Sequence, residues 1–102
     1  LGITFKENCP DIRNTKVVDV VKELEQFGCK VDIYDPWAVA QEVKHEYGRE
    51  IVSSYSMDDY NAIVLAVAHN KFKSIDFAAR GKNTVLYDIK SILPVELVDG
   101  RL

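Results

Sequence analysis

The stretch AIVLAVA, residues Ala62–Ala68, decides the fold class because it contains no polar side chain. A strand with one face in water alternates polar and apolar residues, whereas an unbroken apolar run is typical of a strand that is covered on both faces. We therefore predict a buried strand here, ended by His69 and Asn70. Strands covered on both faces belong to parallel sheets packed between helices.

Four other segments have the apolar or β-branched character of strands. They are the opening segment Leu1–Phe5, the alternating segment Lys30–Tyr34, a short possible edge strand at Ile51–Val52, and a buried strand at Thr84–Tyr87. The chain after Ile92 gives no clear pattern.

A helix is predicted after the opening loop, with Asn14 or Thr15 as its cap and Gly28 as its stop. A second helix is predicted to begin at Asp35-Pro36 and to end at Gly48, because aspartate caps helices and proline suits the first helical position.

Shorter helical elements are predicted in the second half of the chain. Ser56–Asp59 resembles a capping-box turn, and the apolar residues from Phe72 to Ala78 suggest one or two short helices. Because strands and helices alternate, we predict one α/β domain over residues 1–102, a Rossmann-like three-layer structure with a mainly parallel sheet.

Composition excludes several functions. The net charge of −3 and the pI near 5.3 argue against nucleic-acid and membrane-surface partners, and no apolar run reaches the roughly 20 residues of a membrane helix. Two cysteines, Cys9 and Cys29, indicate reduced thiols and a cytoplasmic protein, with Cys29 expected to pack before a strand. The first residue, Leu1, lies within a predicted strand, so we expect a piece of a longer protein.

The carboxyl ends of parallel strands are where ligands bind in open α/β sheets. Lys6, Asp35, His69 and Lys90 fall at these ends, and a lysine near helix-end amides suits an anionic small molecule. The alternative is that polar residues follow buried strands only because loops are solvated. On that reading Asp35 is a helix cap rather than a ribose ligand, and His69 is a structural hydrogen-bonder; His45 is expected on a solvated helix face.

Dinucleotide-binding and P-loop motifs are absent from the sequence, since no glycines are spaced as GxGxxG or GxxxxGK[ST]. No nucleophile stands at a recognisable spacing from a base, so we predict no catalytic residue and no metal site in this chain. The chain is expected to bind rather than to catalyse.

The segment GITFKENCPDIR at Gly2–Arg13 resembles the C-terminal domain of the UDP-glucose/GDP-mannose dehydrogenase family. The resemblance continues through VDIYDPWA at Val31–Ala38, the strand that ends in VAH, and LYDIKSIL at Leu86–Leu93. The forms FKENCPD, YDPWA and AVAH resemble the branch that acts on UDP-N-acetylhexosamines in surface-polysaccharide biosynthesis.

This resemblance implies an NAD-dependent oxidoreductase that converts the C6 alcohol of a UDP-sugar to a carboxylate. It also implies that most of the NAD site and the nucleophilic cysteine lie outside this chain. Phe5 and Lys6 match the family's substrate-contacting pair, and Arg13 matches the arginine that reaches NAD. Asp11 is expected to orient Arg13. Lys90 stands where many relatives have an arginine that faces the substrate, but the setting is YDIK rather than FDGR, so a solvated loop lysine is an equal alternative.

The resemblance also implies a homo-oligomeric full-length enzyme. A different class of function is a free-standing flavodoxin-like regulatory or ligand-binding module, with Asp35 and Asp88 as an acidic site that would bind Mg²⁺. A third possibility is a domain that mainly assembles subunits.

Overall fold

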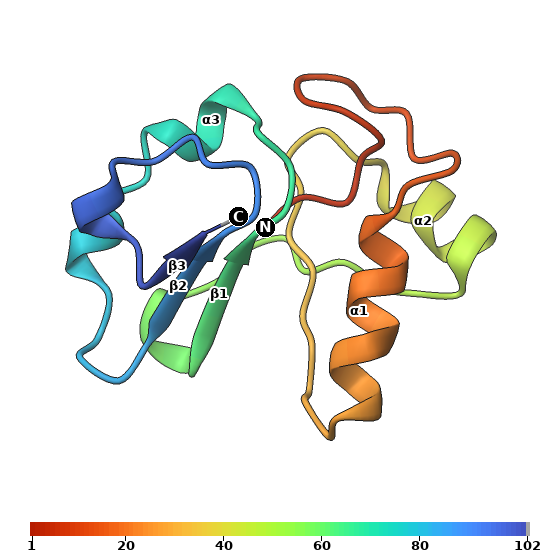
Figure 1. The fold of residues 1–102 in the computed structure, drawn as a ribbon. Helices are drawn as coiled ribbons and strands as arrows, with labels where there is room; N and C mark the ends of the chain where they lie inside the picture. Colours follow the sequence, from red (N-terminus) through yellow and green to blue (C-terminus); the bar gives the residue numbers. More distant parts are fainter. Residues whose placement is uncertain (102) are drawn as a thin grey trace.

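A parallel three-stranded sheet lies at the centre of the second half of the chain (Figure 1). The computed structural model describes residues 1–101, and its strands are β1 (Ala62–Leu65), β2 (Val85–Asp88) and β3 (Gly100–Arg101). The strand order is β1-β2-β3 and both pairings are parallel. The expected α/β class with a parallel sheet is confirmed.

Helical elements alternate with these strands. The α-helices are α1 (Val17–Gln26), α2 (Ala40–Tyr47) and α3 (Asn70–Lys73), and the 3-10 turns are η1 (Met57–Asp59), η2 (Phe77–Ala79) and η3 (Val95–Leu97). The prediction of one or two short helices from Phe72 to Ala78 is confirmed by α3 and η2, whereas η3 and β3 were not predicted. Within residues 1–101 no helix is both long and apolar enough to cross a membrane.

The strands predicted at Leu1–Phe5 and Lys30–Tyr34 are wrong, because neither segment joins a regular ladder. Isolated hydrogen bonds link the opening segment to β1 and the two segments to each other. The Leu1 amino group donates to the Val64 carbonyl (2.6 Å), the Ala66 amide donates to the Leu1 carbonyl (2.9 Å), and the Gly2 amide donates to the Tyr34 carbonyl (2.8 Å). Gly2 has a left-handed φ of 96°, which breaks the extended pattern at this point.

The edge strand predicted at Ile51–Val52 is also wrong. One hydrogen bond of 2.8 Å, from the Val52 amide to the Ile33 carbonyl, is what ties this segment to its neighbour. A single bond does not fix a strand register, so the segment stays irregular.

Local sequence signals set the helix ends. Gly28 and Gly48 have left-handed φ values of 88° and 66° after α1 and α2, as predicted. The residue at the N-cap of α1 is Lys16, which makes no side-chain capping bond, so neither Asn14 nor Thr15 is the cap; the Thr15 hydroxyl does accept a hydrogen bond from the Val17 amide (3.2 Å) in the turn before the helix.

Three finer predictions fail. Helix α2 begins at Ala40 rather than at Pro36, because Asp35 closes a separate turn by accepting hydrogen bonds from the amides of the next residues. No side-chain bond caps η1 at Ser56, so there is no capping box. Cys29 is exposed rather than packed, since it follows the turn that ends α1.

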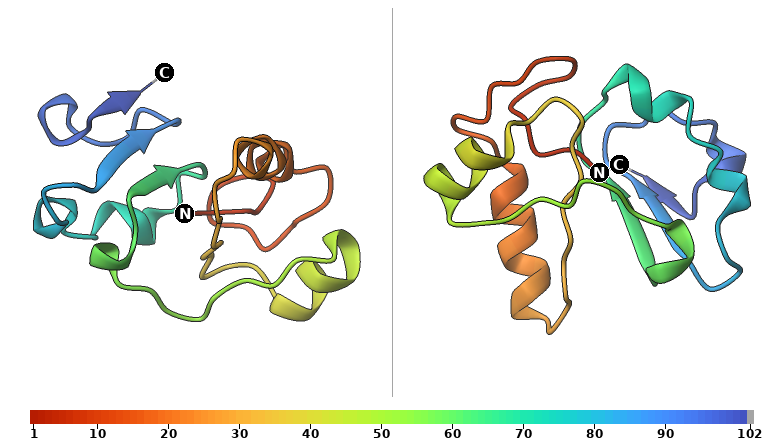
Figure 2. Two further views of the ribbon diagram at one scale, coloured as in Figure 1. Left: turned by 90° about the horizontal axis from the view of Figure 1, so that it is seen from below. Right: turned by 180° about the vertical axis from the view of Figure 1, so that it is seen from behind.

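Two apolar clusters stabilise the molecule. One joins the opening segment to α1 and α2, through Ile3, Ile12, Val18, Val21, Ile33 and Val43. The other lies around the sheet and contains Ile63, Leu65, Phe72, Phe77, Leu86 and Leu93. Figure 2 shows the N-terminus between the sheet on one side and α1 and α2 on the other. The opening segment therefore connects the two halves, and the strand ends and the loop at residues 6–13 lie at the same end of the molecule (Figure 1).

Candidate functional site

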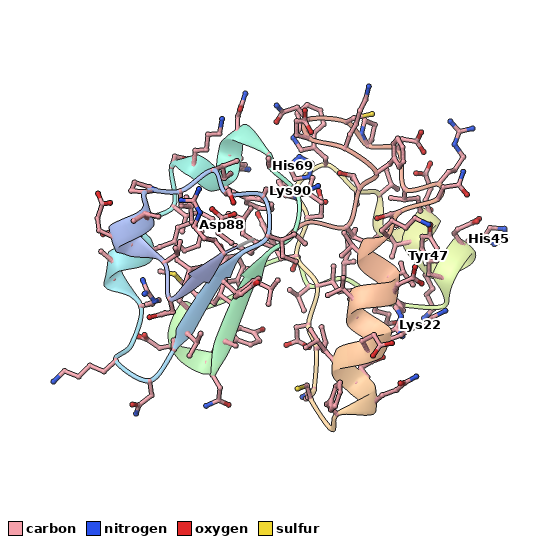
Figure 3. The ribbon with its side chains drawn as sticks, in the orientation of Figure 1. Lys22, His45, Tyr47, His69, Asp88 and Lys90 are labelled. Atoms are coloured by element: carbon pink, nitrogen blue, oxygen red, sulfur yellow. The ribbon has the colours of Figure 1, made fainter. Side chains whose placement is uncertain are left out.

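A hollow of about 260 Å³ opens where β1 and β2 end, and we call it the strand-end groove. Three of the four residues predicted to bind ligand, Phe5, Lys6 and Lys90, line it together. Figure 3 shows His69 and Lys90 at this same end of the sheet. The groove is completed by Thr4, Glu7, Thr15, Lys16, Val17, Val20, Ala66, Val67 and Ile89.

The groove carries a positive charge. Lys6, Lys16 and Lys90 line it with one carboxylate, that of Glu7. The first turn of α1 also borders it, and the amino end of a ten-residue helix carries a partial positive charge. This combination favours a ligand with negative charge, such as a phosphate group.

Lys16 was missed in the sequence. It comes directly before the first residue of α1, at a helix amino end that faces the strand ends, and that position was the available signal.

The groove is not lined by charge alone. Val17, Val20, Val67 and Ile89 contribute apolar side chains, and the Phe5 ring is 57% exposed. An exposed aromatic ring beside cationic groups can pack against a flat organic ring while the lysines meet a charged group. The groove thus has the mixed lining of a small-molecule site.

Arg13 does not join the groove. It lines a separate hollow of about 630 Å³ between residues 9–13 and α2, where the exposed His45 also lies, as predicted. The guanidinium of Arg13 holds Asp11 through Nε to Oδ1 (3.0 Å) and Nη2 to Oδ2 (3.1 Å), so the expected pairing is confirmed. That hydrogen-bonded guanidinium lowers the pKa of the Asp11 carboxyl.

Beneath the loop lies a buried polar cluster of Thr4, Asp35 and His69, which we call the buried triad. Asp35 Oδ2 accepts hydrogen bonds from the amides of Ile3 (2.7 Å) and Thr4 (3.1 Å), and it lies 3.0 Å from His69 Nε2. His69 Nε2 also lies 3.1 Å from Thr4 Oγ1. The His69 side chain is completely buried, so the prediction of a structural hydrogen-bonder is confirmed.

The second oxygen of Asp35 is used as well. Oδ1 accepts hydrogen bonds from the amides of Trp37 (2.7 Å) and Ala38 (3.1 Å). Burial by itself raises the pKa of this carboxyl, but the hydrogen bonds from Ile3, His69 and Trp37 outweigh burial, so the pKa lies below 3.8. Both oxygens accept hydrogen bonds within the fold, so Asp35 has a structural role, although it closes a turn rather than capping a helix.

Asp88 is likewise buried, and it accepts hydrogen bonds from the amides of Lys90 (3.0 Å) and Leu93 (2.8 Å). In residues 1–101 no three His, Cys, Asp or Glu side chains are grouped as metal ligands. Every buried side-chain nitrogen and oxygen in this part of the chain has a hydrogen-bond partner. The carboxylates of Asp35 and Asp88 are therefore used in internal hydrogen bonds.

Known proteins resemble this chain over nearly its whole length. A family model described as "UDP-glucose/GDP-mannose dehydrogenase family, UDP binding domain" matches residues 1–95. The UDP-N-acetyl-D-glucosamine 6-dehydrogenase of Salmonella typhi is 55% identical, and the alignment covers 100% of this chain and 25% of that protein.

Two further relatives have the same relation to the chain. The enzyme of the same name from Pseudomonas aeruginosa is 48% identical, with 100% of this chain and 25% of that protein covered. Protein CapL of Staphylococcus aureus is 34% identical, with 91% and 23% covered. The chain thus spans about a quarter of the length of these curated relatives.

Proposed function

Because this chain belongs to the UDP-glucose/GDP-mannose dehydrogenase family, as its UDP binding domain, we propose that the strand-end groove binds the UDP part of a nucleotide sugar. Lys6 pairs with the diphosphate, and Phe5 and Lys90 contact the same substrate. Arg13 lines the other hollow and is proposed to contact a second ligand rather than the UDP.

The observation that carries this proposal is the meeting of Lys6, Lys16 and Lys90 around one groove. The three lysines come from the opening loop, the start of α1 and the turn after β2, which are far apart in sequence. A diphosphate needs several cationic or N–H donors at once, and this groove supplies them from three directions. This convergence supports a ligand-binding role for Lys90 over that of a solvated loop lysine.

For the full-length protein, we propose oxidation of the C6 alcohol of a UDP-N-acetylhexosamine to the uronate, with NAD as the hydride acceptor. The names of the two most similar relatives reported above support this substrate class. This chain contributes the UDP-binding part and is inactive alone. The full-length enzyme is also proposed to be cytoplasmic and homo-oligomeric.

The residues of this chain do not fit NAD by themselves. The sequence has no GxGxxG turn, and two nitrogens of the Arg13 guanidinium are already bonded to Asp11. We therefore assign NAD to another part of the full-length protein. Arg13 projects from the loop on an exposed side chain and is proposed to reach a phosphate of that cofactor.

The test is the UDP affinity of Lys6→Ala in the full-length protein, measured by isothermal titration calorimetry. Loss of a charge-assisted contact is expected to weaken UDP binding about tenfold, and the deficit is expected to shrink as salt is added. Lys90→Ala is expected to have a smaller effect in the same direction.

Lys82→Ala is the matched control. Lys82 is also an exposed lysine beside a hollow, but that hollow is lined by Asp58, Asp59 and Asn83 rather than by residues that follow the strands. The Lys82→Ala substitution removes the same charge as Lys6→Ala and is expected to leave UDP affinity nearly unchanged. Equal affinities for Lys6→Ala and Lys82→Ala would contradict the proposed site.

A further inference from the structure

We propose that His69 is a positioning residue for the nucleotide site: its ring fixes the loop that carries Phe5 and Lys6 by accepting a hydrogen bond from the backbone amide of Asn8. This inference rests on the proposed function of the strand-end groove. His69 itself is not among the residues that line the groove, so it acts through the loop.

Hydrogen bonding selects one tautomer of the His69 ring. The Asn8 amide can only donate, and it lies 2.8 Å from His69 Nδ1, so Nδ1 is the acceptor and Nε2 carries the proton. That proton faces Asp35 Oδ2 at 3.0 Å. The hydroxyl of Thr4 donates to the Lys6 carbonyl (2.9 Å), which leaves an oxygen lone pair toward Nε2. One arrangement of protons satisfies all these contacts.

The contacts of this cluster reach the loop at both ends of the segment that bears Lys6. Thr4 Oγ1 holds the Lys6 carbonyl, and His69 Nδ1 holds the Asn8 amide. A further bond of 2.9 Å runs from the Asn70 amide to Asn8 Oδ1. The backbone from residue 4 to residue 8 is therefore fixed on either side of Lys6.

Asn8 shows that this anchoring costs conformational energy. Its φ of 55° lies in the left-handed region, which asparagine enters more readily than most non-glycine residues but which is still less favourable than an ordinary backbone conformation. The enforcing contacts are the bonds to His69 and Asn70. Without them the loop would relax toward an ordinary backbone conformation and carry Lys6 with it.

An apolar ring at position 69 would satisfy packing but not this geometry. The His69 ring lies 5.2 Å from the Phe72 ring and 6.3 Å from the Trp37 ring, so aromatic neighbours already surround it. A phenylalanine could fill that space, yet it would leave the Asn8 amide and Asp35 Oδ2 without their ring partner. Packing alone therefore does not explain a histidine here.

Two variants with amide side chains test the roles of the two ring nitrogens of His69 independently. In His69→Asn the side-chain oxygen can replace Nδ1 as acceptor for Asn8, whereas in His69→Gln the side-chain nitrogen can replace Nε2 as donor to Asp35. We expect UDP affinity in the full-length protein to fall about tenfold in His69→Gln and clearly less in His69→Asn. The thermal midpoints, measured in parallel, are not expected to follow that order, because both variants lose the ring.

Asn8→Gly provides a second test on a partly exposed residue that will not unfold the core. Glycine tolerates the positive φ and keeps the backbone amide that donates to His69, while it removes only the Oδ1 contact to Asn70, so we expect UDP affinity to fall less than in His69→Gln. If UDP affinity were equal in His69→Asn and His69→Gln, or lower in Asn8→Gly than in His69→Gln, the positioning role of His69 would be overturned. Should Lys6→Ala bind UDP normally, the proposed function would fail instead, so the two failures are distinguishable.

Discussion

The turn after Tyr34 and the turn after Tyr87 have similar sequences but stabilise different parts of the molecule. Each starts with a buried aspartate that accepts backbone hydrogen bonds, Asp35 in the first and Asp88 in the second. Asp88 accepts hydrogen bonds from the amides of Lys90 and Leu93, which lie two and five residues later in the chain. Asp35 accepts hydrogen bonds from the amides of its own turn. It also forms hydrogen bonds with Ile3, Thr4 and His69, which are 31 to 34 residues away in the sequence.

This difference teaches which turn organises the site. The Asp88 turn closes on itself and presents Lys90. The Asp35 turn ties the opening segment to the end of β1, and the loop with Phe5 and Lys6 rests on that connection. Two sequence patterns of the same kind, YDP and YDI, thus produce one local turn and one junction between distant segments.

The largest expected effect is on stability, in Asp35→Ala compared with Asp88→Ala. Asp35→Ala leaves the buried amides of Ile3 and Thr4 without an acceptor and takes away a His69 partner, so we expect a loss of roughly 3–5 kcal/mol in the free energy of unfolding. Asp88→Ala breaks local bonds and is expected to cost about 1–3 kcal/mol. Urea unfolding followed by circular dichroism measures both.

The fluorescence of Trp37, the only tryptophan, offers a local readout beside the Asp35 turn. Asp35→Ala is expected to change its emission in the folded state, and Asp88→Ala is not. If the two variants lost the same stability and left Trp37 emission alike, the contrast between a junction and a local turn would be wrong.

A smaller effect is expected on pH dependence. The folded-state pKa of Asp35 is lowered from the ordinary value of an aspartate, because the hydrogen bonds to its carboxylate outweigh burial, so the unfolded chain binds its proton first as the pH falls. The stabilisation by the ionised carboxylate is therefore complete above about pH 4 and is lost as the pH falls through the folded-state pKa. Asp35→Asn, which has no such proton, is expected to be less stable at neutral pH and to lose less stability between about pH 4 and pH 2. Parallel curves for Asp35→Asn and the unaltered chain would contradict this.

The smallest structural effect is expected at the exposed end of the loop. The Arg13 side chain is 81% exposed and its ion pair with Asp11 is solvated, so Arg13→Ala should change stability by less than about 1 kcal/mol. Its expected consequence is functional: a higher KM for NAD in the full-length enzyme, with UDP affinity retained because Arg13 lies outside the groove. Steady-state kinetics with varied NAD measure this, and an unaltered KM would remove Arg13 from the cofactor site.

Much of the fold was predictable because it depends on local signals. The apolar run from Ala62 predicted strand β1, although regular pairing ends at Leu65, and Gly28 and Gly48 marked the helix ends. These features follow from side-chain periodicity and from the backbone freedom of glycine. Prediction failed at Leu1–Phe5 and Lys30–Tyr34, whose composition suits strands but whose pairing depends on distant partners and is interrupted at Gly2.

The candidate site was predictable in part. The rule that ligands bind at strand ends placed Lys6 and Lys90 at one edge, and the structure brings both to one groove. Asp35 was expected to cap a helix, and its long-range bonds to Ile3 and His69 could not be read from sequence because no local pattern encodes them. The hydrogen bond between Asn8 and His69 could not be predicted from the sequence for the same reason.

The most direct measurement is a titration of the ¹⁵N-labelled 102-residue chain with UDP, followed by amide chemical shifts. We predict that the shifts change at residues 4–7, 15–17, 66–67 and 89–90, which line the strand-end groove. Changes confined to the hollow beside α2, or no change at millimolar UDP, would contradict the claim that the lysines at the strand ends hold the diphosphate.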